Sequence, residues 1–231
     1  MKIILGNGLL GTYLNSLRGY HSVSRRHDGL DINRPEYFPL FLQDYDTIIN
    51  CMAFTDTYSK DRNLHWNTNY VAVHNLAKYC HENNKKLVHI STDFIYANNS
   101  GVPSEEDIPV HHEDWYSYTK LLGDAAVQMV CNDYNYLICR CTHKPSPFKY
   151  SVAWIDRVGN FDYVEKIGDL IHALIQEDAS GIYNVGTEVK TMFDLAQKTN
   201  PSVIKGPGPS HMPKKTTMNV AKLNHFLKLD G

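Results

Sequence analysis

The chain has 231 residues, of which 42% are hydrophobic and 21% charged. This composition is typical of a globular protein and excludes a disordered or fibrous one. The formal charge of −2 excludes strong attraction to nucleic acid or an anionic membrane. No apolar run approaches the about 18 residues of a membrane span, and the short apolar start is not a signal peptide. The five cysteines are scattered and odd in number. We therefore expect a cytoplasmic protein with reduced thiols, bound to no metal, nucleic acid or membrane.

Short apolar runs alternate with longer amphipathic stretches over the first 142 residues. The pattern predicts strands over 3–5, 20–23, 47–51, 87–91 and 136–140, and helices over 9–17, 64–81 and 117–130. Such alternation favours a parallel sheet with helices on both faces. The predicted fold class is therefore α/β, a doubly wound parallel sheet of the Rossmann type.

The pattern changes after Arg140. Pro145 and Pro147 interrupt the chain, and a helix over 163–175, a strand over 182–185, a Pro/Gly-rich loop over 201–213 and a helix over 220–227 follow. We expect an NADP(H)-binding domain over 1–142, with 163–186 returning to it. Residues 143–162 and 187–231 are expected to form a small C-terminal substrate-binding lobe.

A glycine-rich turn links the first predicted strand to the first predicted helix. Gly6, Gly8 and Gly11 match the G-x-G-x-x-G pattern in the strand–turn–helix context that gives it meaning. Gly6 permits a tight turn, Gly8 lets the backbone approach a pyrophosphate, and Gly11 lets the helix pack on the strand. Asn7, Leu9 and Leu10 complete the predicted cofactor turn. The alternative is a glycine-rich turn with no ligand.

The second predicted strand ends in Ser24, Arg25 and Arg26. An acidic residue at this place holds the ribose 2′-hydroxyl in NAD sites, whereas two guanidinium groups suit a 2′-phosphate. The pair therefore favours NADP(H), with NAD(H) as the alternative cofactor. Asp31 is predicted to bind the adenine amine and Ile32 to pack on the adenine ring. The competing interpretation is a solvated basic loop.

Tyr116 and Lys120 form a Tyr-x-x-x-Lys motif at the start of a predicted helix. Residues four apart share a helical face, so the ammonium of Lys120 can stabilise the phenolate of Tyr116 and also hold the nicotinamide ribose. Thr92 follows the strand over 87–91, at the strand end that faces the ligand crevice in parallel sheets. Its hydroxyl is predicted to orient a substrate carbonyl toward Tyr116. The competing interpretation of Thr92 is a helix cap.

Glycine turn, strand-end threonine and Tyr-x-x-x-Lys, in this order, resemble the extended short-chain dehydrogenase/reductases. Within them the chain is most similar to the dTDP-4-dehydrorhamnose reductases. The similarity is carried further by residues 50–56, 91–94, 181–186 and 213–223.

The resemblance implies additional site residues. Asn69 falls where the superfamily places an asparagine that supports a proton-relay water. Further cofactor contacts are implied at Cys51, Met52, Ala53 and Thr142. Substrate contacts are implied at Thr92, Asp93, Phe94 and His143.

The resemblance implies NADPH-dependent reduction of a 4-keto-6-deoxy nucleotide sugar, with Tyr116 as proton donor. Two alternatives stay open: an NAD(P)-dependent nucleotide-sugar epimerase or dehydratase, and a non-catalytic NADP-binding regulatory subunit like the reductase-like β subunit of methionine adenosyltransferase. The chain is shorter than that family's usual members, and Met212 stands where they carry arginine. The nucleotide and sugar therefore stay undefined. The helices over 64–81 and 117–130 form a dimer interface in many relatives, so the resemblance allows a homodimer.

Overall fold

A computed structural model describes residues 1–107, 114–131 and 135–229. By their internal contacts the residues divide into two compact units. Unit 1 comprises Met1–Ser91, Glu113–Cys139 and Asp178–Ile182. Unit 2 comprises Thr92–His112, Arg140–Glu177 and Tyr183–Gly231.

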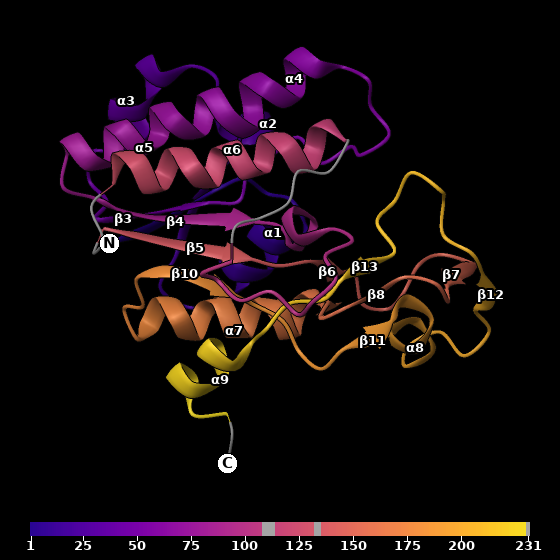
Figure 1. Ribbon diagram of the computed structural model, residues 1–231. Helices are drawn as coiled ribbons and strands as arrows, with labels where there is room; N and C mark the ends of the chain where they lie inside the picture. The colour runs from indigo at the N-terminus through magenta and orange to yellow at the C-terminus, as the bar shows by residue number, and fades with distance from the viewer. Residues whose placement is uncertain (108–113, 132–134, 230–231) are drawn as a thin grey trace. The chain divides into compact units, whose positions relative to one another are not determined.

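The main sheet has six strands in the order β10-β5-β4-β3-β1-β2 (Figure 1). The strands are β1 (Lys2–Leu5), β2 (His21–Val23), β3 (Thr47–Asn50), β4 (Lys86–Ser91), β5 (Tyr136–Arg140) and β10 (Gly181–Asn184). The helices of unit 1 are α1 (Leu9–Ser16), α2 (Arg25–Asp28), η1 (Pro35–Tyr37), α3 (Phe38–Leu42), α4 (Arg62–Trp66), the π turn η2 (Asn67–Val71), α5 (Ala72–Glu82) and α6 (Trp115–Val130). Figure 1 shows α4, α5 and α6 together over one face of the strands.

Strand β1 pairs in parallel with β2 on one side and β3 on the other, and β3 pairs in parallel with β4. Ile3 lies opposite both His21 and Ile48, and Ile48 lies opposite Leu87. The strand order therefore reverses direction at β1. Ligands of open α/β sheets bind at the carboxyl ends of the strands beside such a reversal. In this chain those ends carry the Gly6 turn, after β1, and Cys51, after β3.

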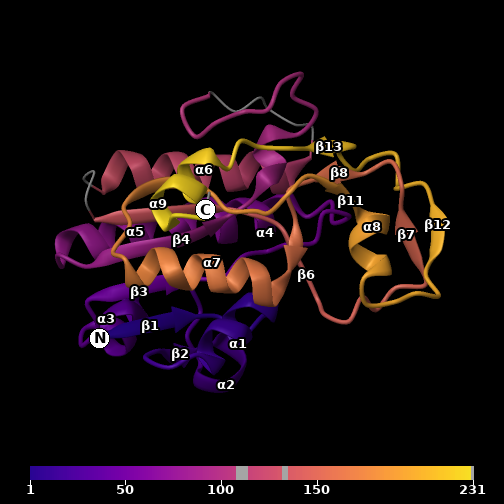
Figure 2. The ribbon, with the colours of Figure 1, turned by 90° about the horizontal axis from the view of Figure 1, so that it is seen from below.

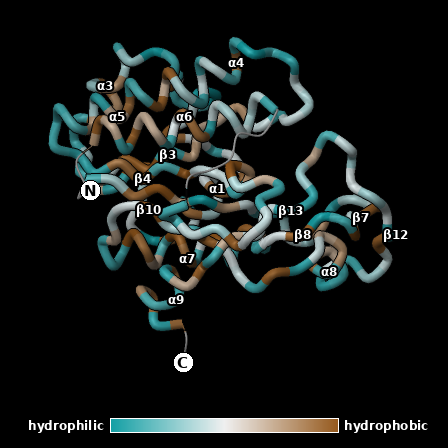
Figure 3. Tube along the Cα trace, viewed as in Figure 1, coloured by the Kyte–Doolittle hydropathy of each residue, from teal (hydrophilic) through white to brown (hydrophobic). Residues whose placement is uncertain are grey.

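The core of unit 1 explains why these segments fold as they do. Alternate residues of the central strands, such as Ile3, Leu5 and Ile48, pack against Leu76 of α5 and Val127 of α6. All five are fully buried, and each contributes about 1.5–3 kcal/mol relative to an exposed side chain. Figure 3 shows the hydrophobic residues concentrated along the central strands.

Unit 2 contains short elements around a second, smaller core. They are η3 (Asp93–Tyr96), β6 (His143–Lys144), β7 (Val152–Trp154), β8 (Val158–Gly159), β9 (Asp162–Tyr163), α7 (Val164–Gln176), β11 (Lys190–Thr191), α8 (Met192–Gln197), β12 (Ile204–Gly206), β13 (Lys215–Thr216) and α9 (Ala221–Leu227). Three small sheets form, β11-β8-β13, β12-β7 and β6-β9. Phe148, Phe161 and Leu195 lie in the core beneath β7 and α8, and Figures 1 and 2 both show β7, β12 and α8 side by side.

The predicted α/β class, a doubly wound parallel sheet of the Rossmann type, is confirmed, and small sheets lie toward the C-terminus. Three local expectations were wrong. The single helix over 64–81 is instead α4 and α5 joined by the π turn, the 201–213 loop contains β12, and Arg25 and Arg26 begin the short helix α2. Within the described residues, no helix is both long and apolar enough to cross a membrane.

Candidate active site

The glycine turn has the shape that a dinucleotide phosphate site requires. Gly6 has a φ of +106°, which glycine adopts without strain, and its N–H donates to the carbonyl of Val23 over 2.8 Å. A Cβ at Gly11 would lie 2.1 Å from the carbonyl oxygen of Gly6, whereas one at Gly8 would meet no atom within 4 Å. Gly8 is the N-cap of α1 and supplies no side-chain cap. The turn is thus closed on the sheet side and open at Gly8, where backbone N–H groups are available to an anion.

The segment after β2 contains both exposed guanidinium groups and buried side chains. Arg25 and Arg26 are exposed, and Arg25 Nε lies 3.3 Å from Asp31 Oδ2. Ser24 is buried, and its hydroxyl caps α2 by accepting from the N–H of His27 over 3.3 Å. Ile32 is only 3% exposed within the core. Of the residues predicted here to bind the cofactor, the two arginines therefore have the most accessible side chains.

The end of β3 lies close to the glycine turn. Asn50 Oδ1 accepts from the N–H of Met52 over 3.0 Å, and a Cβ on Gly6 would lie 3.1 Å from Met52 Cγ. Cys51 and Ala53 are partly exposed beside it. Burial raises the pKa of the Cys51 thiol to about 12, although the charge of Lys120 opposes the shift. The thiol is therefore neutral at physiological pH.

Helix α6 carries both members of the Tyr-x-x-x-Lys motif. Asp114 caps the helix by accepting from the N–H of Ser117 over 2.7 Å, so Tyr116 lies in the first turn and is half-buried. Lys120 is 2% exposed, and its Nζ donates to the carbonyl of Ile90 over 2.7 Å. A buried ammonium on the same helical face as the phenol is the arrangement that lowers the cost of a phenolate.

His89, a strand residue of β4, extends this site inward. Its Nε2 lies 3.4 Å from Lys120 Nζ, and its Nδ1 lies 3.3 Å from Asn50 Nδ2. Burial lowers the pKa of His89 well below 6.5, and the charge of Lys120 lowers it further. The ring is therefore neutral at physiological pH.

Asn69 lies in the π turn and is fully buried. Its Oδ1 accepts from the N–H of Phe54 over 2.8 Å, and its Nδ2 donates to the carbonyl of Phe54 over 2.9 Å. Nδ2 also donates to Thr119 Oγ1 over 3.3 Å. The amide therefore joins the segment after β3 to α6. A Cβ on Gly123 would lie 2.5 Å from the carbonyl oxygen of Asn69, so glycine is needed where α6 passes the π turn.

Within unit 2, Thr92 caps η3 and Asp93 is its first residue. Thr92 Oγ1 accepts from the N–H of Phe94 over 3.3 Å and donates to Asp93 Oδ1 over 3.4 Å. Asp93 also accepts from the hydroxyl of Thr142, and its Oδ2 is buried with no hydrogen-bond partner. Burial raises the pKa of Asp93, while the bond from Thr142 opposes the rise. This threonine–aspartate group is polar, enclosed and incompletely hydrogen-bonded.

Two cations lie near that group. Arg157 is buried, with its guanidinium 4.6 Å from the ring centre of Phe94 and Nη1 donating to the carbonyl of Pro213 over 2.7 Å. Burial and the Arg157 charge lower the pKa of Lys144 to about 8, whereas Asp93 opposes this shift. Burial lowers the pKa of His143 to about 4, with Lys144 adding to the effect. Unit 2 therefore holds positive charge close to Asp93.

Comparison with known families decides the membership of the chain. Residues 1–143 match the RmlD substrate binding domain family, which is more than half of the 231 residues. The chain belongs to the RmlD substrate-binding domain family. The predicted resemblance to dTDP-4-dehydrorhamnose reductases is thereby confirmed at the level of the family.

The sequence identity between this chain and individual relatives is low. The dTDP-4-dehydrorhamnose reductase of Mycolicibacterium smegmatis is 26% identical over 83% of this chain and 65% of its own length. The probable low-salt glycan biosynthesis reductase Agl14 of Haloferax volcanii is 32% identical over 55% of this chain and 48% of its own. The chain thus spans less than two thirds of these RmlD-like relatives.

Solved structures share the fold of this RmlD-family chain. The dTDP-4-dehydrorhamnose reductase of Bacillus anthracis, solved in complex with NADP, superposes with a TM-score of 0.83 over 100% of this chain and 92% of that one, at 23% identity. The UDP-glucuronic acid 4-epimerase of Bacillus cereus, solved with NAD, gives a TM-score of 0.78 over 99% and 92%, at 19% identity. At these identities the likeness shows the α/β fold alone.

Sequence reasoning assigned no role to three buried residues beside the candidate site. Asn50, His89 and Asp124 are all 0% exposed. One signal for Asp124 was available, because it stands four residues after Lys120 and so on the same helical face. A lone histidine inside a predicted strand carries no comparable signal.

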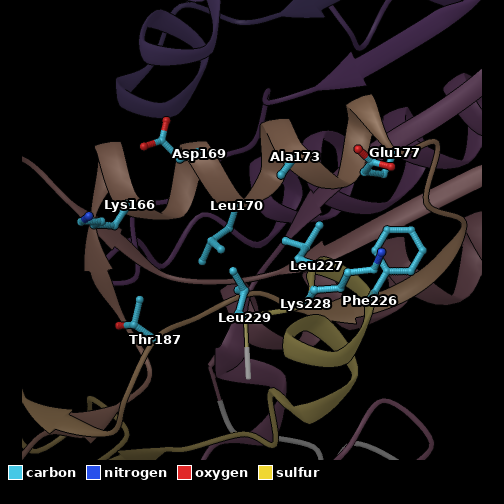
Figure 4. Close-up of a pocket in the computed structure, with 10 residues that line it drawn as sticks. All are labelled: Lys166, Asp169, Leu170, Ala173, Glu177, Thr187, Phe226, Leu227, Lys228 and Leu229. Carbon is cyan, nitrogen blue, oxygen red and sulfur yellow. The ribbon is translucent and has the colours of Figure 1, made fainter. Parts of the chain in front are cut away.

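A cavity of about 480 Å³ lies elsewhere in unit 2, between α7 and the end of α9. Figure 4 shows Leu170 and Ala173 of α7 facing Leu227 and Leu229 across it. None of the predicted site residues lines it. We therefore assign it no part in the candidate active site of this RmlD-family chain.

Proposed function

We propose that this chain binds NADPH and reduces the keto group of a nucleotide-linked 4-keto-6-deoxy sugar. The supporting observation is the buried ammonium of Lys120, held at the carbonyl of Ile90 and four residues from Tyr116 on α6. The Gly6–Gly11 turn lies in the same unit. The names of the relatives support the choice of substrate class, since they include dTDP-4-dehydrorhamnose reductases.

The residues present fit a dinucleotide. The open position at Gly8 and the uncapped start of α1 suit a pyrophosphate. The exposed Arg25 and Arg26 suit a 2′-phosphate, and the edge formed by Cys51, Met52 and Ala53 is partly exposed beside the turn. NADPH, when bound, supplies the hydride.

The side chains of this chain then handle the proton. Tyr116 donates its phenolic proton to the oxygen of the reduced carbonyl, and Lys120 stabilises the phenolate that remains. Within unit 2, the two hydrogen bonds of the Thr92 hydroxyl, of 3.3 and 3.4 Å, are long for a hydroxyl, so exchanging them for a bond to a substrate oxygen costs little. The enclosed carboxyl of Asp93 would bind a sugar hydroxyl.

Oxidation of NADPH, followed by its absorbance, on a panel of dTDP- and UDP-linked 4-keto sugars tests this proposal. Tyr116→Phe should lower kcat by about 10²–10⁴-fold, the usual contribution of a general acid, with little change in NADPH affinity. Tyr118→Phe is the matched control, because Tyr118 lies on the same helix and packs edge-on against Trp115. Absence of turnover across the panel, with NADPH bound, would overturn the proposal.

A regulatory NADP-binding subunit is the second candidate. The matched parts span 65% and 48% of two curated relatives. This candidate predicts NADPH binding and co-purification with a partner enzyme, without turnover. The Tyr116→Phe variant would then behave as the wild type in every assay.

A further inference from the structure

Three buried groups of unit 1 meet at one nitrogen atom of His89. Its Nε2 lies 3.4 Å from Lys120 Nζ and 3.8 Å from Asp124 Oδ1. His89 and Asp124 are 0% exposed and Lys120 is 2% exposed. A buried carboxylate is costly unless a cation or hydrogen bonds compensate it. We therefore look for a cation near Asp124 that compensates the burial of its carboxylate.

The hydrogen bonds of Asn50 fix the form of the imidazole. Because Asn50 Oδ1 accepts from the N–H of Met52, the amide nitrogen is turned toward His89 Nδ1. An amide N–H donates, so Nδ1 accepts, and the single proton of the neutral ring lies on Nε2. The Lys120 ammonium has no acceptor for this N–H, whereas the Asp124 carboxylate, with Oδ1 3.8 Å from Nε2, is an acceptor group beside it. A neutral ring cannot compensate the carboxylate charge, whereas the Lys120 ammonium, one helical turn from Asp124, can.

We propose that Asp124 keeps the amino group of Lys120 in its ammonium form at the carbonyl of Ile90. Asp124 is then a positioning residue, which acts on the proposed reduction only through Lys120. The inference thus deepens the proposed function. The coupling of the Asp124 carboxylate to the buried ammonium of Lys120 exists in the protein without any ligand, so it can be measured there.

Asp124 is the carboxylate that shares His89 Nε2 with Lys120. The Cys51 thiol, after β3, is neutral because its pKa is raised to about 12. Arg62 of α4 is directed to the ring of Trp115, 5.2 Å away, and His65 packs edge-on against Phe54. On α6 itself, the phenol of Tyr116 is the group on which Lys120 is proposed to act.

Titration of lysine side chains by NMR tests the inference without substrate or cofactor. Lysine labelled with ¹³C at Cε reports each amine, and Lys120→Met identifies the signal of Lys120. In Asp124→Asn the midpoint of that signal should fall by about one pH unit or more, as expected for loss of a nearby opposite charge. Asp124→Glu should restore most of the shift, and Asp124→Ser should reproduce it if the asparagine variant folds poorly.

Two further variants make the result specific. His89→Gln keeps the carboxylate, so the Lys120 midpoint should move less than half as far as in Asp124→Asn. Asp162→Asn removes another buried carboxylate, which pairs with Lys190 over 2.7 Å in unit 2, and should leave the Lys120 midpoint unchanged. An unchanged midpoint in Asp124→Asn, or an equal shift in Asp162→Asn, would overturn the inference.

Measurements of activity against pH distinguish a failure of this inference from a failure of the proposed function. If the wild type reduces nucleotide sugars, the alkaline limb of kcat against pH should lie about one unit lower in Asp124→Asn. A uniform loss of kcat at every pH, with no displaced limb, would contradict the role of Asp124. If the wild type shows no turnover at all, the proposed function fails while the NMR titration still decides the coupling.

Discussion

A Cβ atom on Gly11 would lie 2.1 Å from the carbonyl oxygen of Gly6. The clash is with backbone, so no side chain can rotate away to relieve it. Gly11→Ala should therefore lower the free energy of unfolding by about 3 kcal/mol, at the upper end for an overpacked site, and abolish NADPH binding. Denaturant titration and calorimetric binding measure the two effects.

Gly8→Ala is the informative counterpart. No atom lies within 4 Å of the added Cβ, and the residue's φ of −67° and ψ of −173° suit alanine. Stability should stay within about 0.5 kcal/mol of the wild type, whereas affinity for NADPH should fall if a pyrophosphate approaches here. Undiminished affinity in Gly8→Ala would count against the phosphate site.

The cofactor preference should depend on two exposed guanidinium groups. Arg25→Ala and Arg26→Ala should each weaken NADPH binding by about 10-fold, the equivalent of about 1.4 kcal/mol for a charged contact. NADH binding should change little, because NADH lacks the 2′-phosphate. Isothermal titration with both cofactors measures the ratio. Arg18→Ala, another exposed arginine, is the control, and equal losses for both cofactors would refute the assignment.

The amide of Asn69 should be a large contributor to stability. Asn69→Ala removes the bonds to the N–H and the carbonyl of Phe54 and should cost about 2–4 kcal/mol, because buried polar groups are left without partners. Asn67→Ala, in the same π turn but exposed, should cost under about 0.5 kcal/mol. Urea unfolding measures the stability of both variants. Equal unfolding midpoints would show that the hydrogen bonds of Asn69 to Phe54 do not stabilise the fold.

Stability should fall on mild acidification, in part because of His143. Burial lowers the pKa of this side chain from 6.5 to about 4, so between those values the unfolded chain binds a proton that the folded chain does not. The linked loss is at most roughly 3 kcal/mol, and it grows as the pH falls from about 6.5 to 4. His143→Gln should flatten this part of the stability profile, whereas the exposed His81→Gln should not.

The measurement for this prediction is the free energy of unfolding at several pH values between 7 and 4. His89, whose pKa is also lowered, keeps some slope in every variant. A profile for His143→Gln that parallels the wild type would show that His143 binds its proton as readily in the folded chain as in the unfolded chain.

Local pattern was enough to predict most of the elements and the glycine turn. The apolar periodicity of α6 and the β-branched run of β3 are short-range signals, which the packing of unit 1 reinforces. The start of α6 was placed two residues late, because the cap is the carboxylate of Asp114. The functional boundary near residue 142 and the role of each site residue stay predictions.

What could not be predicted depends on partners far away in sequence. The π turn is held by the bonds of Asn69 to Phe54 and Thr119, and no local pattern encodes them. Strand β12 has three residues and pairs only with β7 among the described strands, opposite Val152 to Trp154. The contact of His89 with Lys120 spans 31 positions.

The contacts of Asn69 restrict how a proton can travel through this part of the protein. Both hydrogens of its amide group are engaged, one at the Phe54 carbonyl and one at the Thr119 hydroxyl. A water molecule therefore finds no donor on this side chain and can meet only the remaining lone pair of Oδ1. A solvent chain at the π turn would therefore be anchored by acceptor oxygens, of this amide or of the main chain, and replacing the side chain would also disturb it through the shape of the turn.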